Sequence, residues 1–433
     1  MMIQRKHLMH VVAIGWLCLP TVASAAGYGL AEQGAAYIAK GGTGVASTLD
    51  ASALYFNPAQ ITRLPGTQLY LGTTLLTPTT SFAGVDPYPG FGVTESSKAR
   101  QFFPPHAYVT HNYGNHWAVG AGVNAPFGLG LEWKDPAHFT GRYISTLAEL
   151  SALNGMVSAA YAFDPQWSFA AGANAIFAKV KLENRKLAVV PGGGGAQVDV
   201  AKTRLESDFE SGFGWNAGLS FTPTKQLALG ACYRSKVVTH IDDARATITQ
   251  IPTGDPAFDA AVAAGLPPSQ TVGTVLRFPA TWSAGVAWLP RETLTLAADF
   301  NFIEWSVFRD LPIRFKTTPS ANQTVIEDYD DSWQVRLGVE HRATACSYRL
   351  GYYYDHSPVP SKSVSPILPD ASRNGVSAGL GFGLGAARRM TLDLYELAVF
   401  FDKRSTEHVE RDGYDGTYKS FANSAGVSLG YHW

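Results

Sequence analysis

Residues 278–302 read FPATWSAGVAWLPRETLTLAADFNF, and this stretch decides the fold class. In its first half, apolar side chains occupy every second position, from Phe278 and Ala280 through Trp282 to Trp288. After a short polar link, the second half repeats the alternation. Because an α-helix needs apolar spacings of three and four, a strict period of two predicts a pair of β-strands, each with one apolar and one polar face.

The same alternation recurs along most of the chain. We predict fourteen strands, near residues 67–76, 101–112, 117–124, 152–163, 167–182, 205–221, 227–241, 275–288, 293–305, 331–342, 347–355, 374–385, 390–402 and 419–433. Short links between them alternate with links of roughly a dozen residues or more, as in barrels whose short turns face the periplasm. Both ends of the barrel are therefore expected on the periplasmic side.

The composition supports a membrane protein. Only 16% of the residues are charged and 12% are aromatic, whereas soluble domains carry roughly 25% charged residues. After the first 25 residues, no apolar run approaches the roughly 20 residues that a membrane-spanning helix needs. The predicted fold class is therefore an all-β membrane protein, an antiparallel transmembrane β-barrel in which alternate side chains face lipid and a polar lumen.

Residues 1–25 have the pattern of a secretory signal peptide. Basic residues at 5–7 precede an apolar run over 8–19 and the small-residue site Ala23-Ser24-Ala25. Cleavage is expected before Ala26. The alternative, a lipoprotein anchored at Cys18, is weaker because Leu17 stands where a small residue would be expected. We predict a protein of the outer membrane of a Gram-negative cell.

Charge and the last strand bear on the partners. The formal net charge is −1, and loss of Arg5 and Lys6 with the signal peptide leaves −3, which gives no reason to expect nucleic acid. The chain ends with Leu429, Tyr431 and Trp433 on one face of a strand. This aromatic ending resembles the signal that barrel-assembly machinery reads, so we expect that machinery as a partner during biogenesis.

Residues 26–66 precede the first strand and lack sustained alternation. Glycine-rich and proline-containing stretches, such as 41–44 and 57–59, predict compact turns and short helices there. Barrels of about fourteen strands have a lumen that must be filled or gated. We therefore divide the chain into a signal peptide (1–25), an N-terminal hatch or plug inside the lumen (26–66) and a transmembrane barrel (67–433).

Several motifs resemble a known family. The stretches Gly34–Ala46 and Ala51–Ala59 resemble the hatch of the FadL long-chain fatty acid transporters, a family that also includes toluene and xylene uptake channels. Further similarity lies at Arg277-Phe278-Pro279-Ala280-Thr281 and Leu368-Pro369-Asp370. The similar stretches follow one another over nearly the whole mature chain, and Asn57-Pro58-Ala59 is the most specific of them.

The resemblance implies a monomeric fourteen-stranded barrel with a hydrophobic ligand site and sideways exit of the ligand. The mature N-terminus, Ala26, Gly27 and Tyr28, would lie near the ligand, and a kink in the third strand would open the wall. The sequence offers a candidate kink at Asn124-Ala125-Pro126-Phe127-Gly128, because proline cannot donate to a ladder and glycine weakens one. The alternative is that Pro126 simply begins an outer loop.

Two long loops are candidates for ligand capture, 134–153 and 241–272, since both mix short helical patterns with apolar residues. The first contains Phe139, Arg142 and Tyr143. Arg142 would suit a carboxylate head group. The alternatives are that the apolar residues pack the loop on itself, and that Arg142 contacts lipopolysaccharide or a neighbouring acid.

Other candidate sites are fewer. Asp299, Arg336, Arg349 and Asp393 fall on lumen-facing positions, where they line a path, pair with one another or anchor the plug. The histidines are scattered, and no metal-ligand spacing, cofactor motif or catalytic serine, histidine and acid set is evident. Whether Cys232 and Cys346 form a disulfide is left open.

The predicted function is outer-membrane transport of a hydrophobic small molecule. The ligand is a long-chain fatty acid or, alternatively, a monoaromatic hydrocarbon, because both share the apolar driving force. A general porin, an outer-membrane enzyme and an adhesion barrel are the competing classes. Outer-membrane lipid and lipopolysaccharide are the remaining expected partners.

Overall fold

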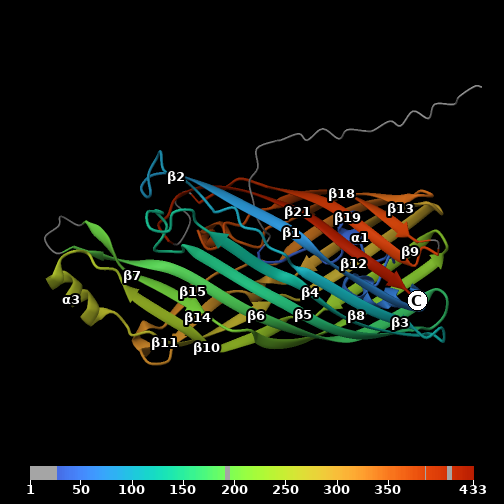
Figure 1. The fold of residues 1–433 in the computed structure, drawn as a ribbon, viewed down its shortest axis with the longest axis horizontal. Coiled ribbons are helices and arrows are strands. Elements are labelled where there is room, and N and C mark those ends of the chain that lie inside the picture. The colour runs from blue at the N-terminus through green and yellow to red at the C-terminus, as the bar shows by residue number, and fades with distance from the viewer. Residues whose placement is uncertain (1–26, 191–195, 386, 407–411) are drawn as a thin grey trace, which may run out of the picture.

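The computed structural model describes residues 27–190, 196–385, 387–406 and 412–433, so the predicted signal peptide and Ala26 lie outside the described residues. The strands form one elongated barrel with long connections at one end and short ones at the other (Figure 1). In the described part of the chain, no helix is long and apolar enough to cross a membrane.

Antiparallel pairing closes the barrel, because the first strand pairs with both the second and the last. The fourteen strands of the closed circuit are β1 (Thr67–Gly84), β3 (Pro105–Asn112), β4 (Trp117–Glu132), β5 (Leu147–Ala162), β6 (Trp167–Val189), β8 (Glu210–Thr224), β9 (Leu227–Arg234), β12 (Thr281–Arg291), β13 (Leu294–Ile303), β16 (Ser332–Arg342), β17 (Cys346–Asp355), β18 (Arg373–Leu384), β19 (Met390–Phe401) and β21 (Gly416–His432). The predicted fourteen-stranded barrel is confirmed.

Additional strands and helices lie mainly at the end with long connections. The strands β7, β10, β11, β14 and β15 pair in that order and prolong one side of the barrel outward from β6. The bounds are β2 (Thr94–Ser96), β7 (Gln197–Glu206), β10 (Val237–Gln250), α3 (Pro256–Gly265), β11 (Gln270–Phe278), η2 (Trp305–Val307), β14 (Asp310–Phe315), η3 (Pro319–Ala321), β15 (Gln323–Ile326), η4 (Ser361–Ser363) and β20 (Arg404–Ser405).

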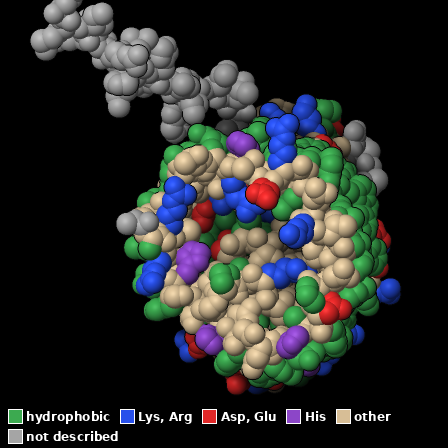
Figure 2. Space-filling model, turned by 90° about the vertical axis from the view of Figure 1, so that its right-hand side faces the viewer, with side chains coloured by type: hydrophobic (Ala, Val, Ile, Leu, Met, Phe, Trp, Pro, Cys, Tyr) green, Lys and Arg blue, Asp and Glu red, His purple; other side chains and the backbone are tan. Residues whose placement is uncertain are grey.

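Side-chain burial follows the predicted alternation. On β12 and β13, Trp282 is 52% exposed and Phe300 is 47% exposed, whereas Asp299 between the outward positions is 4% exposed. From the end with short connections, apolar side chains cover the outside of the barrel and charged groups gather around the hollow centre (Figure 2). The apolar face is the one a lipid bilayer would cover.

The predicted face is wrong for Phe278 and Ala280, which are both 1% exposed. Pro279 lacks an N–H and lies between the end of β11 and the start of β12. The break shifts the alternation, so Phe278 turns inward while Trp282 faces outward. Similar breaks divide the predicted strands 205–221 and 227–241, because Ser207–Phe209 separate β7 from β8 and Ser235–Lys236 separate β9 from β10.

The two predicted capture loops are also shorter than expected. The predicted loop 134–153 ends at residue 146, because β5 begins at Leu147. The predicted loop 241–272 is reduced to 251–269, because β10 and β11 extend outward. Both cysteines are free: Cys232 lies on β9 and Cys346 begins β17. The described residues therefore contain no disulfide.

The N-terminal segment, residues 27–66, packs inside the barrel as α1 (Ala35–Ile38), α2 (Ala53–Phe56), η1 (Pro58–Arg63) and turns. Asn57 fastens it to the wall, because its Nδ2 donates to the carbonyls of Val45, at 2.8 Å, and Leu219, at 3.0 Å. Ser168 on β6 donates its hydroxyl to the carbonyl of Ala59 at 3.1 Å.

Lumen charges complete the attachment of the N-terminal segment. One carboxylate oxygen of Asp299 accepts the backbone N–H groups of Gly44, at 2.6 Å, and Val45, at 3.0 Å. The guanidinium of Arg349 pairs with Asp393 at 2.5 Å. These contacts agree with the predictions that the lumen charges pair with one another or anchor the N-terminal segment, rather than with the prediction that they line a path.

We expect Asp299→Ala to loosen the turn at residues 43–46, because two buried N–H groups lose their acceptor, at a cost of about 1–3 kcal/mol each. Hydrogen exchange of Gly44 and Val45 measures this, and exchange should accelerate. Asn301→Ala is the matched control, since Asn301 lies two residues along the same strand and donates to Gln334 instead. Equal exchange in the two variants would contradict the anchoring role.

Candidate ligand-binding site and wall opening

An apolar cavity of about 290 Å³ lies inside the outward extension of the barrel. It is enclosed mainly by aliphatic and aromatic side chains, among them Leu129, Ile144, Leu205, Val272, Leu276, Phe308, Ile313, Val325 and Leu368. We call this space the outer cavity. Its size and lining suit a hydrophobic ligand.

Tyr28 forms the floor of the outer cavity and lies within a cluster of rings. Its ring centroid is 4.7 Å from Trp305, 5.4 Å from Phe308 and 6.0 Å from Phe127. The hydroxyl donates to the carbonyl of Arg277 at 2.7 Å. These edge-to-face contacts separate the outer cavity from the spaces below it.

The predicted kink in the third barrel strand is present. β4 continues past Pro126 to Glu132 and pairs with β5, but its register shifts between Asn124 and Phe127, so that two residues oppose one. The alternative that Pro126 begins an outer loop is therefore wrong. Such a bulge leaves a residue unpaired and bends the strand.

The bulge coincides with a gap in the wall. Backbone pairing of β3 with β4 stops at Ala107 and Val123, and backbone hydrogen bonding to the preceding chain resumes where the N–H of Lys98 donates to the carbonyl of Glu132 at 2.7 Å. Between these points, the ring of Phe102 packs against Gly130, and the N-terminal segment is the backbone partner of β4. The N–H of Leu30 donates to the carbonyl of Pro126, and the N–H of Gly128 donates to that of Tyr28, both at 2.8 Å.

A second cavity, of about 530 Å³, occupies this gap. Its lining includes the buried lumen residues Tyr353 and Arg373 and the exposed residues Phe103 and Phe209. We call it the side cavity. It shares Leu129, Glu149 and Leu150 with the outer cavity, so the two spaces adjoin.

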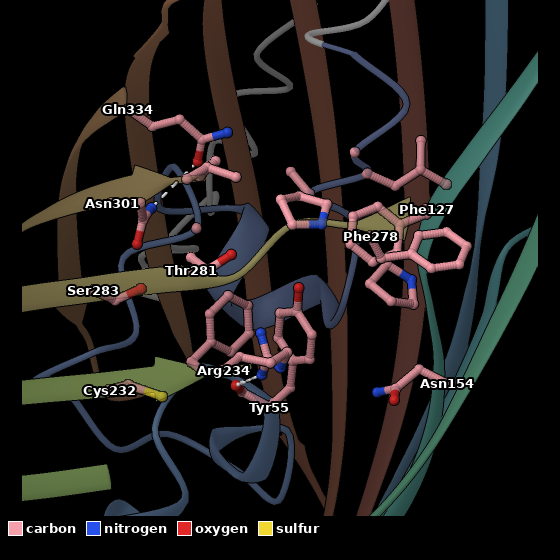
Figure 3. A pocket seen from close by; sticks show the side chains of 18 of the residues that line it. Tyr55, Phe127, Asn154, Cys232, Arg234, Phe278, Thr281, Ser283, Asn301 and Gln334 are labelled. Atoms are coloured by element: carbon pink, nitrogen blue, oxygen red, sulfur yellow. Dashed lines mark hydrogen bonds between the residues drawn. The ribbon is translucent and has the colours of Figure 1, made fainter. Parts of the chain in front are cut away.

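A third cavity, of about 110 Å³, lies beneath the aromatic cluster, and we call it the lower chamber. Phe127 and Phe278 lie above Arg234 and Tyr55, and Cys232, Ser283, Asn301 and Gln334 lie to one side (Figure 3). Its upper lining is therefore apolar and the remainder polar.

Asp370, in the loop before β18, touches the first described residues of the chain. Its side chain is fully buried, and one oxygen accepts the hydroxyl of Ser357 at 2.5 Å. Burial raises its pKa from 3.8 to about 7, while Ser357, Arg373 and the backbone N–H of Gly27 oppose the rise. Gly27 adjoins Tyr28, so this carboxyl lies beside the floor of the outer cavity.

The predicted site residues fall into three groups. Gly27, Tyr28, Pro126, Phe127 and Gly128 come together at the aromatic cluster and the gap, although Gly27 contacts Trp305 rather than an open space. The Nδ2 of Asn154 donates to the side-chain oxygen of Asn124 at 2.9 Å, just below the gap. Asn57, Pro58 and Ala59 lie at the opposite end of the segment, where they fasten it.

Phe139, Arg142 and Tyr143 of the first capture loop do not line the outer cavity, whereas Ile144 of that loop and Leu266 of the second loop do. Phe139 is buried and stacks on Trp133 at 4.2 Å, and Tyr143 packs beside this cluster. The Nε of Arg142 donates to Asp199 at 2.8 Å, a carboxylate that also pairs with Arg185. Contact with a neighbouring acid was the alternative for Arg142, and a ligand-reading role stays a prediction.

Sequence reasoning missed Trp305, Phe308 and Lys186. The alternation predicts a strand that ends at Trp305, but β13 stops at Ile303 and η2 turns the indole inward. Lys186 lies on the outward half of β6, where polar residues occur on both faces. No alternation marks such a stretch, and only its position near apolar strands could have indicated a role.

The comparisons with known proteins agree with this geometry. The family model described as outer membrane protein transport protein (OMPP1/FadL/TodX) matches residues 16–433. The chain is 25% identical to the long-chain fatty acid transport protein of Escherichia coli O6:H1, over 86% of each chain. It is 26% identical to the 47 kDa outer membrane protein of Pasteurella multocida, over 95% of each.

Solved structures show the same fold. A FadL homologue from Pseudomonas aeruginosa has a TM-score of 0.82 at 19% identity, over 94% of this chain and 99% of that one. The toluene transporter TodX of Pseudomonas putida has a TM-score of 0.73 at 18% identity, with the same coverage. The chain belongs to the OMPP1/FadL/TodX family and is an outer-membrane transporter of hydrophobic compounds, not an enzyme.

Proposed function

We propose that this protein takes up long-chain fatty acids, which enter the outer cavity, pass the aromatic cluster and leave through the gap between β3 and β4 into the membrane. The observation that carries the proposal is the shared lining of the outer and side cavities at Leu129, Glu149 and Leu150. An apolar path thus leads from the outer end of the barrel to its lipid-facing wall.

The hydrophobic effect accounts for entry. Burial of apolar surface is worth roughly 25 cal/mol per Å², so a long alkyl chain moves readily from dilute water into the outer cavity. The exposed Phe103 and Phe209 flank the outlet. Exit into the bilayer keeps the alkyl chain out of water, whereas exit into the periplasm would expose it again.

Lys186 favours an acid over a neutral hydrocarbon. It is the one cation lining the outer cavity in the part of the chain that the structure describes, and no described carboxylate lies within 4.0 Å of its ammonium. The same lining contains three acids, of which Glu149 pairs with Arg100, Glu183 pairs with Lys202 and Glu327 is buried. An ionised head group at the mouth would therefore meet an unpaired positive charge.

Tyr28 and its neighbours are the proposed gate. The segment from Tyr28 to Leu30 meets β4 through only two backbone hydrogen bonds, whereas the turn near Gly44 and the helix end at Asn57 are held by buried side chains. A ligand that displaces Tyr28 would connect the cavities without moving the rest of the segment. Residues 33–66 then act as a fixed hatch.

The names of the curated relatives support this choice. Several of them are long-chain fatty acid transport proteins, at 23–25% identity over about 85% of this chain. The toluene transporters resemble the chain in fold. A monoaromatic hydrocarbon is therefore the alternative ligand that the experiments below must distinguish.

Closing the gap should block uptake without abolishing binding. We expect deletion of Ala125 combined with Pro126→Val to restore the regular ladder, leave fatty acid affinity in detergent nearly unchanged, and lower uptake by cells about tenfold or more. The control is deletion of Thr222 with Pro223→Val, which removes a similar bulge at the periplasmic end of β8. Unchanged uptake in the first variant would overturn the sideways exit.

Replacing the unpaired cation Lys186 should weaken the binding of a fatty acid but not that of its neutral ester. Lys186→Gln is expected to reduce the affinity for a long-chain fatty acid about tenfold, the loss of one charge-assisted contact, while the methyl ester binds as before. Isothermal titration in detergent compares the two ligands, and Lys202→Gln is the control because Lys202 pairs with Glu183 at 2.7 Å. Tighter binding of toluene than of the acid by the unaltered protein would favour the aromatic alternative.

Docking of the N-terminal segment should depend on pH. The pKa of Asp370 is raised to about 7, so the docked state binds an extra proton and loses stability as pH rises from about 4 to about 7. Hydrogen exchange of residues 27–34, corrected for the intrinsic rate, should therefore show more opening at pH 8 than at pH 5. Asp370→Asn should flatten this dependence, whereas the exposed Asp328→Asn should retain it.

A further inference from the structure

The lower chamber contains an unusual set of unsatisfied polar groups. Five of its lining residues have a buried side-chain atom without a hydrogen-bond partner in the described part of the chain, namely Asn154 Oδ1, Asn174 Nδ2, Arg234 Nε, Asp299 Oδ1 and Arg336 Nε. Buried polar atoms are normally paired, so their concentration around one cavity indicates that something polar binds there.

Two arginines give this chamber an excess of positive charge. Arg234 donates from Nη2 to the carbonyl of Tyr55 at 2.7 Å and lies over the ring of Tyr55, 4.2 Å from its centroid. Arg336 is 8% exposed and donates to the carbonyl of Gly41 at 3.3 Å and to Gln334 at 2.9 Å. No described carboxylate lies within 4.0 Å of either guanidinium.

The other charges nearby do not cancel this excess. Asp299 lies opposite Arg336 in the pairing of β13 with β16, but one of its oxygens is occupied by the N–H groups of Gly44 and Val45. Arg373, which also lines the chamber, is neutralised by Asp355 at 2.5 Å. Two arginines therefore face one acid, of which Oδ2 is engaged by the backbone and Oδ1 has no partner among the described residues.

We infer that the lower chamber is an anion-binding subsite for a carboxylate, held by Arg234 and Arg336. A guanidinium forms strong, directional hydrogen bonds with a carboxylate, and a buried one without a counter-charge is costly. Asn174 adds an amide whose Nδ2 has no partner among the described residues. A carboxylate would accept hydrogen bonds from the three unpaired donors, Arg234 Nε, Arg336 Nε and Asn174 Nδ2.

The apolar roof indicates what else the anion carries. Phe127, Phe278 and Trp305 cover the chamber from above, and the chamber shares Leu30 and Phe127 with the side cavity. An amphiphile would fit with its carboxylate downward and its alkyl chain toward the gap. Binding of an amphiphile in this orientation rests on the proposed function. Binding of a small free carboxylate would use the same contacts and does not depend on the proposed function.

The test uses the full barrel in detergent and hexadecanoic acid labelled with ¹³C at the carboxyl carbon. We expect two bound carboxyl resonances, one from the outer cavity and one from the lower chamber. The double variant Arg234→Gln and Arg336→Gln should lose the second, weakening that site about tenfold or more, and keep the first. Arg204→Gln, which removes an arginine of β7 in the outward extension, is the control and should keep both resonances.

Labelled acetate distinguishes the sources of the carboxylate. Acetate bound in the unaltered barrel and lost in the double variant, together with no bound hexadecanoate, would support the anion subsite and refute the fatty acid proposal. Bound resonances that are the same in the double variant and the control would overturn the subsite.

Because both arginines also contact the N-terminal segment, folding of each variant is checked by its heat-dependent gel migration. The conservative variants Arg234→Lys and Arg336→Lys keep the charge and should retain the second resonance. In the unaltered protein, that carboxyl should stay ionised to lower pH than the outer one, and equal titration of the two would also overturn the subsite.

Discussion

The satisfaction of backbone hydrogen bonds within lipid is the constraint on which this structure depends. A barrel meets it by closing its ladder, so any gap in the wall leaves N–H and C=O groups that need other partners. Here the bulge at Pro126 opens the ladder between β3 and β4, and Tyr28 and Leu30 supply the missing backbone partners. The N-terminal segment thus stabilises the gap and at the same time obstructs it.

This double role explains why the segment is held so unequally. Its far part is fixed in the buried lumen by two side chains. The amide of Asn57 donates a hydrogen bond, and the carboxylate of Asp299 accepts two. Its first residues are held by two backbone hydrogen bonds to β4, by the hydroxyl of Tyr28, which donates to the carbonyl of Arg277, by the contact of Gly27 with Asp370, and by ring contacts around Tyr28. An alkyl chain can replace ring contacts at little cost. It cannot replace the carboxylate oxygen of Asp299, which accepts the N–H groups of Gly44 and Val45.

The sequence predicted the spanning strands well and the outer strands poorly, for one physical reason. Alternation of apolar and polar residues arises where one face meets lipid and the other a polar lumen. Most of the outward extension, formed by β7, β10, β11, β14 and β15, was predicted as loops, and only residues 205–206, 237–241 and 275–278 of it lay within predicted strands. Pro126 was identified because proline restricts the backbone itself, whereas Lys186 and Trp305 depend on contacts between distant segments, which no local pattern records.

The polarity of the lumen changes with depth, and this gradient bears on direction. The lining of the outer cavity is mainly apolar and contains Lys186, which has no carboxylate partner among the described residues, whereas the lower chamber combines an apolar roof with Arg234 and Arg336. A neutral hydrocarbon would gain nothing from the lower chamber, so it would pass directly from the outer cavity to the gap. In the proposed path a carboxylate binds at both levels, and with its head group held below the gap, its alkyl chain would lie beside the proposed exit.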